Sequence, residues 1–385
     1  MKRLSLLLLL AAGACAPGPG VGTPAAEQAP AGPFGIVLFI GDGAGISYWS
    51  AARHASSDLA IEQLPTIGLV DTRSANSRVT DSAASGTAIS AGVRTFNGGI
   101  GVAPDSSPVR TVLELAESRR MATGLVVTCR VTHATPAVFA AHVPDRNMYW
   151  EIARQMSDHD IDVLLGGGRR FFDPKLRPDS VDLLSRITSD AAYVDSPEAF
   201  DALDPDTVSK LVGLFAETDP PPATERRPSL PDLTHTALQV LEKDPQGFFL
   251  MVEGSQIDWR GHDNAPLPLV IAEVLDLDMA IRQALQFRER RPNTLVLVLA
   301  DHSTGGLALQ YDEEGRFVGR YTTEGHTGEM IPLFAVGPGA EAFAGIHDND
   351  EVGRLLLQMV EAGGPVPAGQ LTTSSNRRPW SPSSR

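Results

Sequence analysis

Side chains that commonly bind metal ions follow two apolar runs in this sequence. Asp301 and His302 come directly after residues 294–300, and Asp42 comes shortly after residues 36–40. Short apolar runs predict buried strands, and open α/β sheets place their chemistry just beyond the carboxyl ends of their strands. Two strands that bring carboxylates and an imidazole to one edge of a sheet therefore predict a site for divalent metal ions.

Four more side chains extend this set. Glu253 ends a third apolar run, Asp258 and His262 are four residues apart, and His326 lies in a glycine-rich loop. A spacing of four places two side chains on one face of a helical turn. Three protein ligands and an open position are typical of catalytic zinc, and two such ions about 4 Å apart suit in-line displacement at phosphorus. Taken singly, these residues also fit helix caps and polar core groups, which predicts a protein that is purified without metal.

Ser82 is the candidate nucleophile. The small residues that follow it, as far as Ala88, predict a helix that begins at or near Ser82. A helix N-terminus offers backbone donors to an anion. Two interpretations stay open at this point, because a serine there either caps the helix or faces a metal ion that lowers the pKa of its hydroxyl.

A further segment offers oxygen, nitrogen and a positive charge. His133 and Thr135 are two residues apart, so in an extended segment they point to the same side. Arg146 carries a planar fork that can bind two oxygens of a phosphoryl group. A surface ion pair is the alternative role for Arg146.

Apolar runs alternate with helical stretches along the chain. We expect strands at residues 36–40, 124–128, 163–165, 248–253, 294–300 and 332–336, and helices at 109–119, 148–158, 233–243 and 268–288. This alternation predicts a doubly wound α/β sheet with helices on both faces. The polar, acidic and proline-bearing residues 180–227 are expected to form a surface excursion.

Composition narrows the classes of partner. The chain has 385 residues, 42% of them hydrophobic, with a formal net charge of -15, which is enough for one large domain or two ordinary ones. This charge argues against a nucleic-acid-binding face, whereas a small phosphorylated molecule stays compatible because bound cations reverse the local field. Cys129 ends an apolar run and is expected to be a buried structural thiol.

The N-terminus has the pattern of an export signal. Lys2 and Arg3 precede a leucine-rich run and small residues before Cys15, so residues 1–15 are interpreted as a signal peptide. Cleavage before Cys15 would leave a cysteine for lipid attachment, as in bacterial lipoproteins, which predicts a periplasmic or outer-membrane-anchored protein; a soluble exported protein is the alternative. We expect a flexible linker at residues 16–33, a catalytic domain at 34–364 and a disordered tail at 365–385.

As a set, these motifs closely resemble the alkaline phosphatase family. The nucleophile segment is Asp81-Ser82-Ala83-Ala84-Ser85, and five further pieces match in order. They are Gly-Asp-Gly at Asp42, Thr-His-Ala-Thr-Pro at His133 with Arg146 after it, Val-Glu-Gly at Glu253 with Asp258 and His262, Asp301-His302, and Gly-His-Thr-Gly at His326. The resemblance runs from residue 34 to about 338. Each motif alone is weak, but six in the correct order are specific.

The resemblance implies a fold, a ligand set and a mechanism. The fold would be a three-layer α/β/α sandwich around a large, mostly parallel sheet. The interval between His302 and His326 is short and leaves room for little or no crown insertion, so homodimer formation stays open. One zinc would be held by Asp258, His262 and His326, and a second by Asp42, Asp301 and His302. Asp42 would also bridge to a third ion, usually magnesium, together with Thr135 and Glu253.

Two residues depart from the best-known bacterial members of the family. His133 stands where those proteins carry Asp, and Trp259 stands where they carry Lys. Magnesium prefers an all-oxygen shell, whereas imidazole favours zinc or another transition metal. His133 therefore leaves the identity of the third ion open.

The implied activity is zinc-dependent hydrolysis of small phosphate monoesters, with Ser82 transiently phosphorylated and Arg146 binding the phosphate. The alternatives are a phosphodiesterase of the same superfamily and a non-catalytic metal-binding lipoprotein. A sulfatase would need a Cys/Ser-x-Pro-x-Arg motif, and the residues after Ser82 lack both the proline and the arginine.

Overall fold

The computed structural model describes residues 32–366, and ten strands in this range form one sheet. The strand order is β14-β2-β13-β8-β1-β7-β3-β4-β6-β5, and β13 is the strand that runs antiparallel to both of its neighbours. The bounds are β1 Gly35–Gly41, β2 Thr66–Asp71, β3 Ala122–Arg130, β4 Val163–Gly167, β5 Ala192–Val194, β6 Leu211–Leu214, β7 Phe248–Gly254, β8 Thr294–Leu299, β13 Ile331–Val336 and β14 Gly345–Asp348.

The centre of this sheet is apolar because helices cover both of its faces. Every residue of β1, β7 and β8 is buried, so these strands read as continuous apolar runs. They are parallel and in register, with Ile40 beside both Glu253 and Leu299. Three neighbouring strands therefore end at the same level, and the residues that follow them meet at one edge of the sheet.

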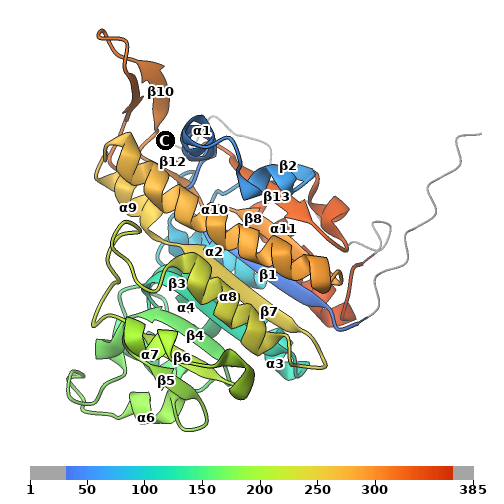
Figure 1. Ribbon diagram of the computed structural model, residues 1–385. Coiled ribbons are helices and arrows are strands. Elements are labelled where there is room, and N and C mark those ends of the chain that lie inside the picture. The colour runs from blue at the N-terminus through green and yellow to red at the C-terminus, as the bar shows by residue number, and fades with distance from the viewer. Residues whose placement is uncertain (1–31, 367–385) are drawn as a thin grey trace, which may run out of the picture.

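Helices form the two outer layers (Figure 1). On one face α10 packs against α8 and α1, and on the other α2 contacts α4 and α11, while α3 packs on α4 and α11. The bounds are α1 Ile46–Ala55, α2 Ser82–Ala91, α3 Val112–Ser118, α4 Ala134–Ala140, α5 Tyr149–Met156, α6 Leu183–Ile187, α7 Pro197–Asp201, α8 Leu230–Leu241, α9 Gln256–His262, α10 Leu267–Arg290 and α11 Asn349–Ala362.

This architecture confirms the predicted three-layer α/β/α fold, and all six expected strands are present. The expectation of a surface excursion at residues 180–227 was wrong, because β5 and β6 extend the main sheet beyond β4. The four residues of β6 are all buried, but so short a run gives a weak signal in the sequence. Strands β2 and β14, at the other end of the sheet, were not predicted.

The interval between His302 and His326 contains no large insertion. It forms the short strand β9 Ser303–Thr304 and a hairpin of β10 Ala308–Tyr311 and β11 Phe317–Arg320, before β12 His326–Thr327. The hairpin projects from the end of the molecule at which the site lies (Figure 1). The predicted signal peptide, almost all of the predicted linker and most of the predicted tail lie outside the described residues. Among the described helices, none combines the length and apolar character needed to cross a membrane.

Candidate active site

The ends of β1 and β8 bring together the first three predicted residues. The Nε2 atom of His302 lies 3.4 Å from Oδ1 of Asp42 and 3.2 Å from Oδ2 of Asp301, and all three side chains are fully buried. Asp301 also accepts a hydrogen bond from the backbone N–H of Gly43, 3.1 Å away. That contact joins the two strand ends.

We call Asp42, Asp301, Glu253, His133 and Thr135 the deep cluster.

A second cluster lies closer to the surface, and we call Asp258, His262 and His326 the rim cluster. Asp258 and His262 are on α9, so the predicted helical turn does place them on one face. Nε2 of His262 lies 3.2 Å from Oδ2 of Asp258 and 3.2 Å from Nε2 of His326, and Nε2 of His326 lies 3.6 Å from Oδ1 of Asp258. His302 connects the clusters, because its ring stacks on that of His326 with centroids 3.6 Å apart.

Backbone carbonyls set the orientation of the two rim histidines. Nδ1 of His326 donates to the carbonyl of Thr80 at 2.9 Å, and Nδ1 of His262 donates to the carbonyl of Glu324. A carbonyl oxygen only accepts, so each Nδ1 must carry a proton. The neutral ring then has its lone pair on Nε2, the atom that faces Asp258.

Ser82 lies at the first residue of α2, beside the shared histidine. Its Oγ is 3.3 Å from Nε2 of His302, and the residue is 2% exposed. The helix N-cap is Asp81, whose side chain accepts from the backbone N–H of Ala84, so Ser82 is free of the capping role that the sequence left open. The whole of α2 is buried, and its small residues permit this: a Cβ on Gly86 would lie 2.9 Å from Val138.

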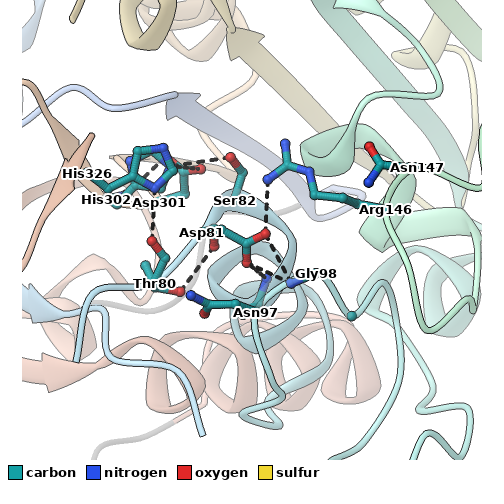
Figure 2. Close-up of polar contacts among 12 residues, drawn as sticks. Thr80, Asp81, Ser82, Asn97, Gly98, Arg146, Asn147, Asp301, His302 and His326 are labelled. Carbon is teal, nitrogen blue, oxygen red and sulfur yellow. Dashed lines mark hydrogen bonds and ion pairs between the residues drawn. The ribbon is translucent and has the colours of Figure 1, made fainter. Parts of the chain in front are cut away.

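Arg146 reaches the same place from the opposite side (Figure 2). Its Nη1 donates to Oδ2 of Asp81 at 3.0 Å, and its Nη2 lies 3.4 Å from Nε2 of His133. Asp81 also accepts from the backbone N–H of Gly98. Asp81 thus links the helix of Ser82 to the guanidinium of Arg146, a role that the sequence analysis missed although an aspartate directly before a helix is a recognisable cap.

The remaining predicted residues, His133, Thr135 and Glu253, are also buried. Ligand atoms of His133 and Glu253 lie within 4.8 Å of one another and of the Cys129 thiol. The expectation of an extended segment at His133 and Thr135 was wrong, because His133 is the N-cap of α4 and Thr135 lies in its first turn. Pro136, next in the chain, is the signal of a helix start that could have revealed this. Cys129 is buried as expected, and its sulfur is 3.5 Å from Oε2 of Glu253.

The deep cluster contains more negative charge than the protein around it balances. Burial, and after it the charges of Asp301 and other nearby carboxylates, raises the pKa of Asp42 well above its ordinary value. Burial likewise raises the pKa of Glu253 to about 7. Neither Asp42 oxygen has a hydrogen-bond partner, nor do Oδ2 of Asp301, Oε1 of Glu253, Oγ1 of Thr135 and Nδ1 of His133. Buried polar atoms are almost always paired, so this donor set fits cations.

The rim cluster is electrostatically different. Burial alone would raise the pKa of Asp258, but the hydrogen bond from His262 and the charges of His302 and His326 outweigh it and hold the pKa below its ordinary range. The same hydrogen bond raises the pKa of His262 to about 9. Burial, and then His302, lowers the pKa of His326 to about 4, and burial followed by Arg146 lowers that of His133. His326 and His133 are therefore neutral at neutral pH, the state in which imidazole binds metal.

The fold and the site together define a class: an α/β/α enzyme in which carboxylate and imidazole clusters suited to cations adjoin a serine and an arginine. The chain belongs to the alkaline phosphatase family, whose family model, described as alkaline phosphatase, matches residues 35–319. The protein is therefore a phosphatase, a hydrolase of small phosphate monoesters.

Individual relatives agree with this assignment. Alkaline phosphatase 3 of Bacillus subtilis is 34% identical over 85% of this chain and 88% of its own length. The structure of an alkaline phosphatase from the Antarctic bacterium TAB5 superposes with a TM-score of 0.80 and 37% identity, covering 86% of this chain and 98% of that one. A variant of the Antarctic enzyme with glutamate in place of a histidine, described with magnesium in a site called M3, superposes with a TM-score of 0.78 at the same identity and coverage.

Proposed function

We propose that this protein hydrolyses phosphate monoesters in two steps through a phosphoserine at Ser82, and that it depends on zinc. The observation that carries the proposal is the position of Ser82: its Oγ is 3.3 Å from Nε2 of His302, and Arg146 approaches from the other side (Figure 2). In this arrangement an attacking oxygen and a binder of anionic oxygens face the same space.

The residues present fit two zinc ions. Asp258, His262 and His326 would hold one, and Asp42, Asp301 and His302 the other. The unpartnered buried oxygens of Asp42 and the Nε2 lone pair of the neutral His326 support this assignment. When bound, the ions would supply positive charge that lowers the pKa of a serine hydroxyl or of water and stabilises the leaving oxygen.

The chain's own side chains would carry the rest of the mechanism. Ser82 Oγ forms a bond to phosphorus as the ester oxygen departs, and water then cleaves the phosphoserine, releasing inorganic phosphate. The N-terminus of α2 presents backbone N–H groups and the positive end of its dipole to the phosphoryl group. Arg146, fixed by Asp81, would bind two non-bridging oxygens and keep phosphorus in line with Ser82.

A third ion would lie between Asp42, Thr135 and Glu253, with His133 close by. Magnesium is described in one site of the Antarctic enzyme when a histidine there is replaced by glutamate. Here His133 offers a neutral imidazole nitrogen, a donor that favours zinc over magnesium. We propose that His133→Asp shifts the third site toward magnesium, which elemental analysis after equilibration with both ions would measure.

Replacement of the nucleophile tests the proposed function. Ser82→Ala should lower kcat by roughly four orders of magnitude or more, because it removes the hydroxyl that we propose forms the covalent intermediate. Zinc content should stay the same, since Ser82 is not one of the proposed ligands. Ser85→Ala is the matched control, because Ser85 lies one turn further along α2 and its hydroxyl accepts from Asn349 instead. Full activity of Ser82→Ala would rule out the covalent route.

Two alternatives are separated by simple assays. A diesterase would hydrolyse bis-p-nitrophenyl phosphate faster than the monoester. A non-catalytic metal-binding lipoprotein would release no burst of p-nitrophenol when the enzyme is stoichiometric with the substrate. The joint placement of Ser82 and Arg146 supports the monoesterase.

The proposal includes export. Lys2, Arg3 and the leucine-rich run before Cys15 support a signal peptide, with lipid attached at Cys15 as one outcome and a soluble periplasmic form as the other. Labelling of cells with a radioactive fatty acid, with Cys15→Ser as the control, would distinguish the two. The large exposed side chains of Ile46 and Ile67 support testing for a homodimer by sedimentation.

A further inference from the structure

Two histidines outside the proposed metal clusters pair with glutamates of the same helix, α3. Nε2 of His142 lies 2.8 Å from Oε1 of Glu114, and Nδ1 of His159 lies 2.9 Å from Oε2 of Glu117. The two histidines are equally buried, with 17% and 16% of their side chains exposed. The two histidines differ in the other contacts of their rings.

The ring of His142 also contacts a backbone carbonyl. Its Nδ1 is 2.6 Å from the oxygen of Gly101, so both ring nitrogens face acceptors. A neutral imidazole has one N–H, so only the doubly protonated ring satisfies both contacts. Burial opposes that charge, but the hydrogen bonds to Glu114 and Gly101 outweigh it and raise the pKa of His142.

The contact with Gly101 joins two chain segments that run antiparallel. Ile100 and Val143 exchange two backbone hydrogen bonds of 2.9 Å, and the N–H of Arg146 donates to the carbonyl of Gly98 at 2.9 Å. A Cβ at Gly101, where φ is +57°, would collide with the carbonyl of Ala141. His142 thus closes one end of this pair of segments, and Arg146 lies at the other end.

The same pair of segments is attached to the helix of Ser82. Thr87 on α2 donates to the carbonyl of Gly99 at 3.1 Å and accepts from the N–H of Gly101 at 3.0 Å. At the other end, Asp81 holds both Gly98 and Arg146 (Figure 2). The distance between Ser82 and Arg146 is therefore set by these segments.

We propose that His142, as a cation held between Glu114 and the Gly101 carbonyl, is a positioning residue that keeps Arg146 in line with Ser82. The inference rests on the proposed role of Arg146 in binding phosphate. The main chain of His142 is anchored separately, since Gln155 accepts from its N–H at 2.7 Å and donates to its carbonyl at 3.3 Å. Loss of the ring thus removes the link to Gly101 while α5 still holds the segment.

The test is competitive inhibition by inorganic phosphate, measured on the metal-loaded enzyme. His142→Ala should raise the Ki of phosphate and the KM of the ester by roughly tenfold or more, because a displaced catalytic group costs up to about a hundredfold. His159→Ala is the matched control. It loses an equivalent contact to α3 and should leave the Ki unchanged. His142→Gln, a smaller change that keeps a donor, should be intermediate, and melting curves would establish that each variant is folded at the assay temperature.

A double-mutant cycle with Arg146→Ala separates positioning from general destabilisation. If His142 acts through Arg146, His142→Ala should have no further effect on the Ki once Arg146 is alanine. An equal effect in both backgrounds, or an equal effect of His159→Ala, would overturn the inference. If Arg146→Ala itself leaves the Ki unchanged, the proposed role of Arg146 fails. If Arg146→Ala raises the Ki and His142→Ala does not, the inference about His142 is rejected while the proposed role of Arg146 stands.

The charge of His142 gives a second, independent readout. Glu114 on α3 contacts its ring directly, and His159, after α5, is the nearby histidine that pairs with Glu117 of the same helix; Glu151 on α5 binds Gln155, which holds the main chain of His142. When His142 loses its second proton, one of its ring nitrogens has a lone pair that faces the oxygen of Glu114 or Gly101, and that contact is lost. The Ki of phosphate in the native enzyme should therefore rise as pH rises through the titration of His142. In His142→Ala that component should be missing; an identical pH profile would contradict the proposal.

Discussion

The deep cluster and the rim cluster use the same types of side chain but differ in charge balance. In the rim cluster Asp258 faces imidazoles, which lower its pKa, and the side chain of His262 is 40% exposed. In the deep cluster Asp42 and Glu253 are fully buried among other carboxylates, and their pKa values are raised. In the rim cluster the carboxylate is balanced by imidazoles of the protein itself, whereas the carboxylates of the deep cluster have no such counter-charge.

This difference shows where bound cations contribute most to stability. Ionised carboxylates that are buried without partners destabilise the folded state, and a ligand that binds only the folded state stabilises it. Cations in the deep cluster would therefore contribute to folding as well as to chemistry. An ion in the rim cluster would serve mainly the proposed reaction.

The largest expected effect follows removal of all metal. Chelation should abolish activity. It should also lower the melting temperature at pH 8, because Asp42 and Glu253 lose their counter-charges and must then either stay ionised without a partner or take up protons. Differential scanning calorimetry with elemental analysis checks both, and added zinc should restore activity. An unchanged melting temperature in verified metal-free protein would break the distinction between the clusters.

Glu253→Gln should have opposite effects with and without metal. In metal-free protein at pH 8 it should stabilise the fold by about 1–3 kcal/mol, because it removes a fully buried carboxylate whose raised pKa opposes folding. In metal-loaded protein it should destabilise, because one of the proposed ligand oxygens is lost. Urea unfolding in both states measures the two signs, and destabilisation in both would contradict the charge argument.

Asp258→Asn should give the opposite result in metal-free protein. It removes the carboxylate that pairs with His262 and faces His326 and His302, so it should destabilise by about 1–2 kcal/mol, a value kept low by the exposure of His262. The same urea experiment measures it. Stabilisation by Asp258→Asn would mean that the rim cluster, too, is short of positive charge.

The sequence predicted the centre of the fold because its strands are buried on both faces. Residues 36–40, 248–253 and 294–300 are continuous apolar runs, and parallel pairing places Asp42, Glu253 and Asp301 at one edge. Outer strands such as β2 and β5 carry a weaker signal, because β2 exposes Ile67 and β5 has three residues.

The sequence predicted the residues of the candidate site better than the contacts that join them. The sequence suggested Ser82 at a helix start, and Asp258 and His262 on one turn, since both follow from local spacing. The contact of Asp81 with Arg146 and that of His142 with Gly101 depend on chain segments meeting in space. No local pattern encodes such contacts.

The smallest predicted effect is the pH dependence of stability in metal-free protein, where the clusters should act in different ranges. Glu253 has a folded pKa of about 7 against an ordinary 4.5, so the folded state holds a proton that the unfolded chain releases, and stability falls as pH rises between these values. His262, at about 9 against 6.5, stabilises fully below 6.5 and loses that contribution as pH rises toward 9.

Calorimetry of metal-free protein from pH 5 to 10 resolves the two ranges. Glu253→Gln should lessen the fall in melting temperature in the lower range, to which Asp42 also contributes, and leave the upper one. Asp258→Asn should lessen the upper fall and leave the lower one, because His262 then loses the partner that raises its pKa. The upper fall should be the smaller, since solvent screens the half-exposed His262. If each variant kept both falls at full size, the pairing of charges assigned to the two clusters would be wrong.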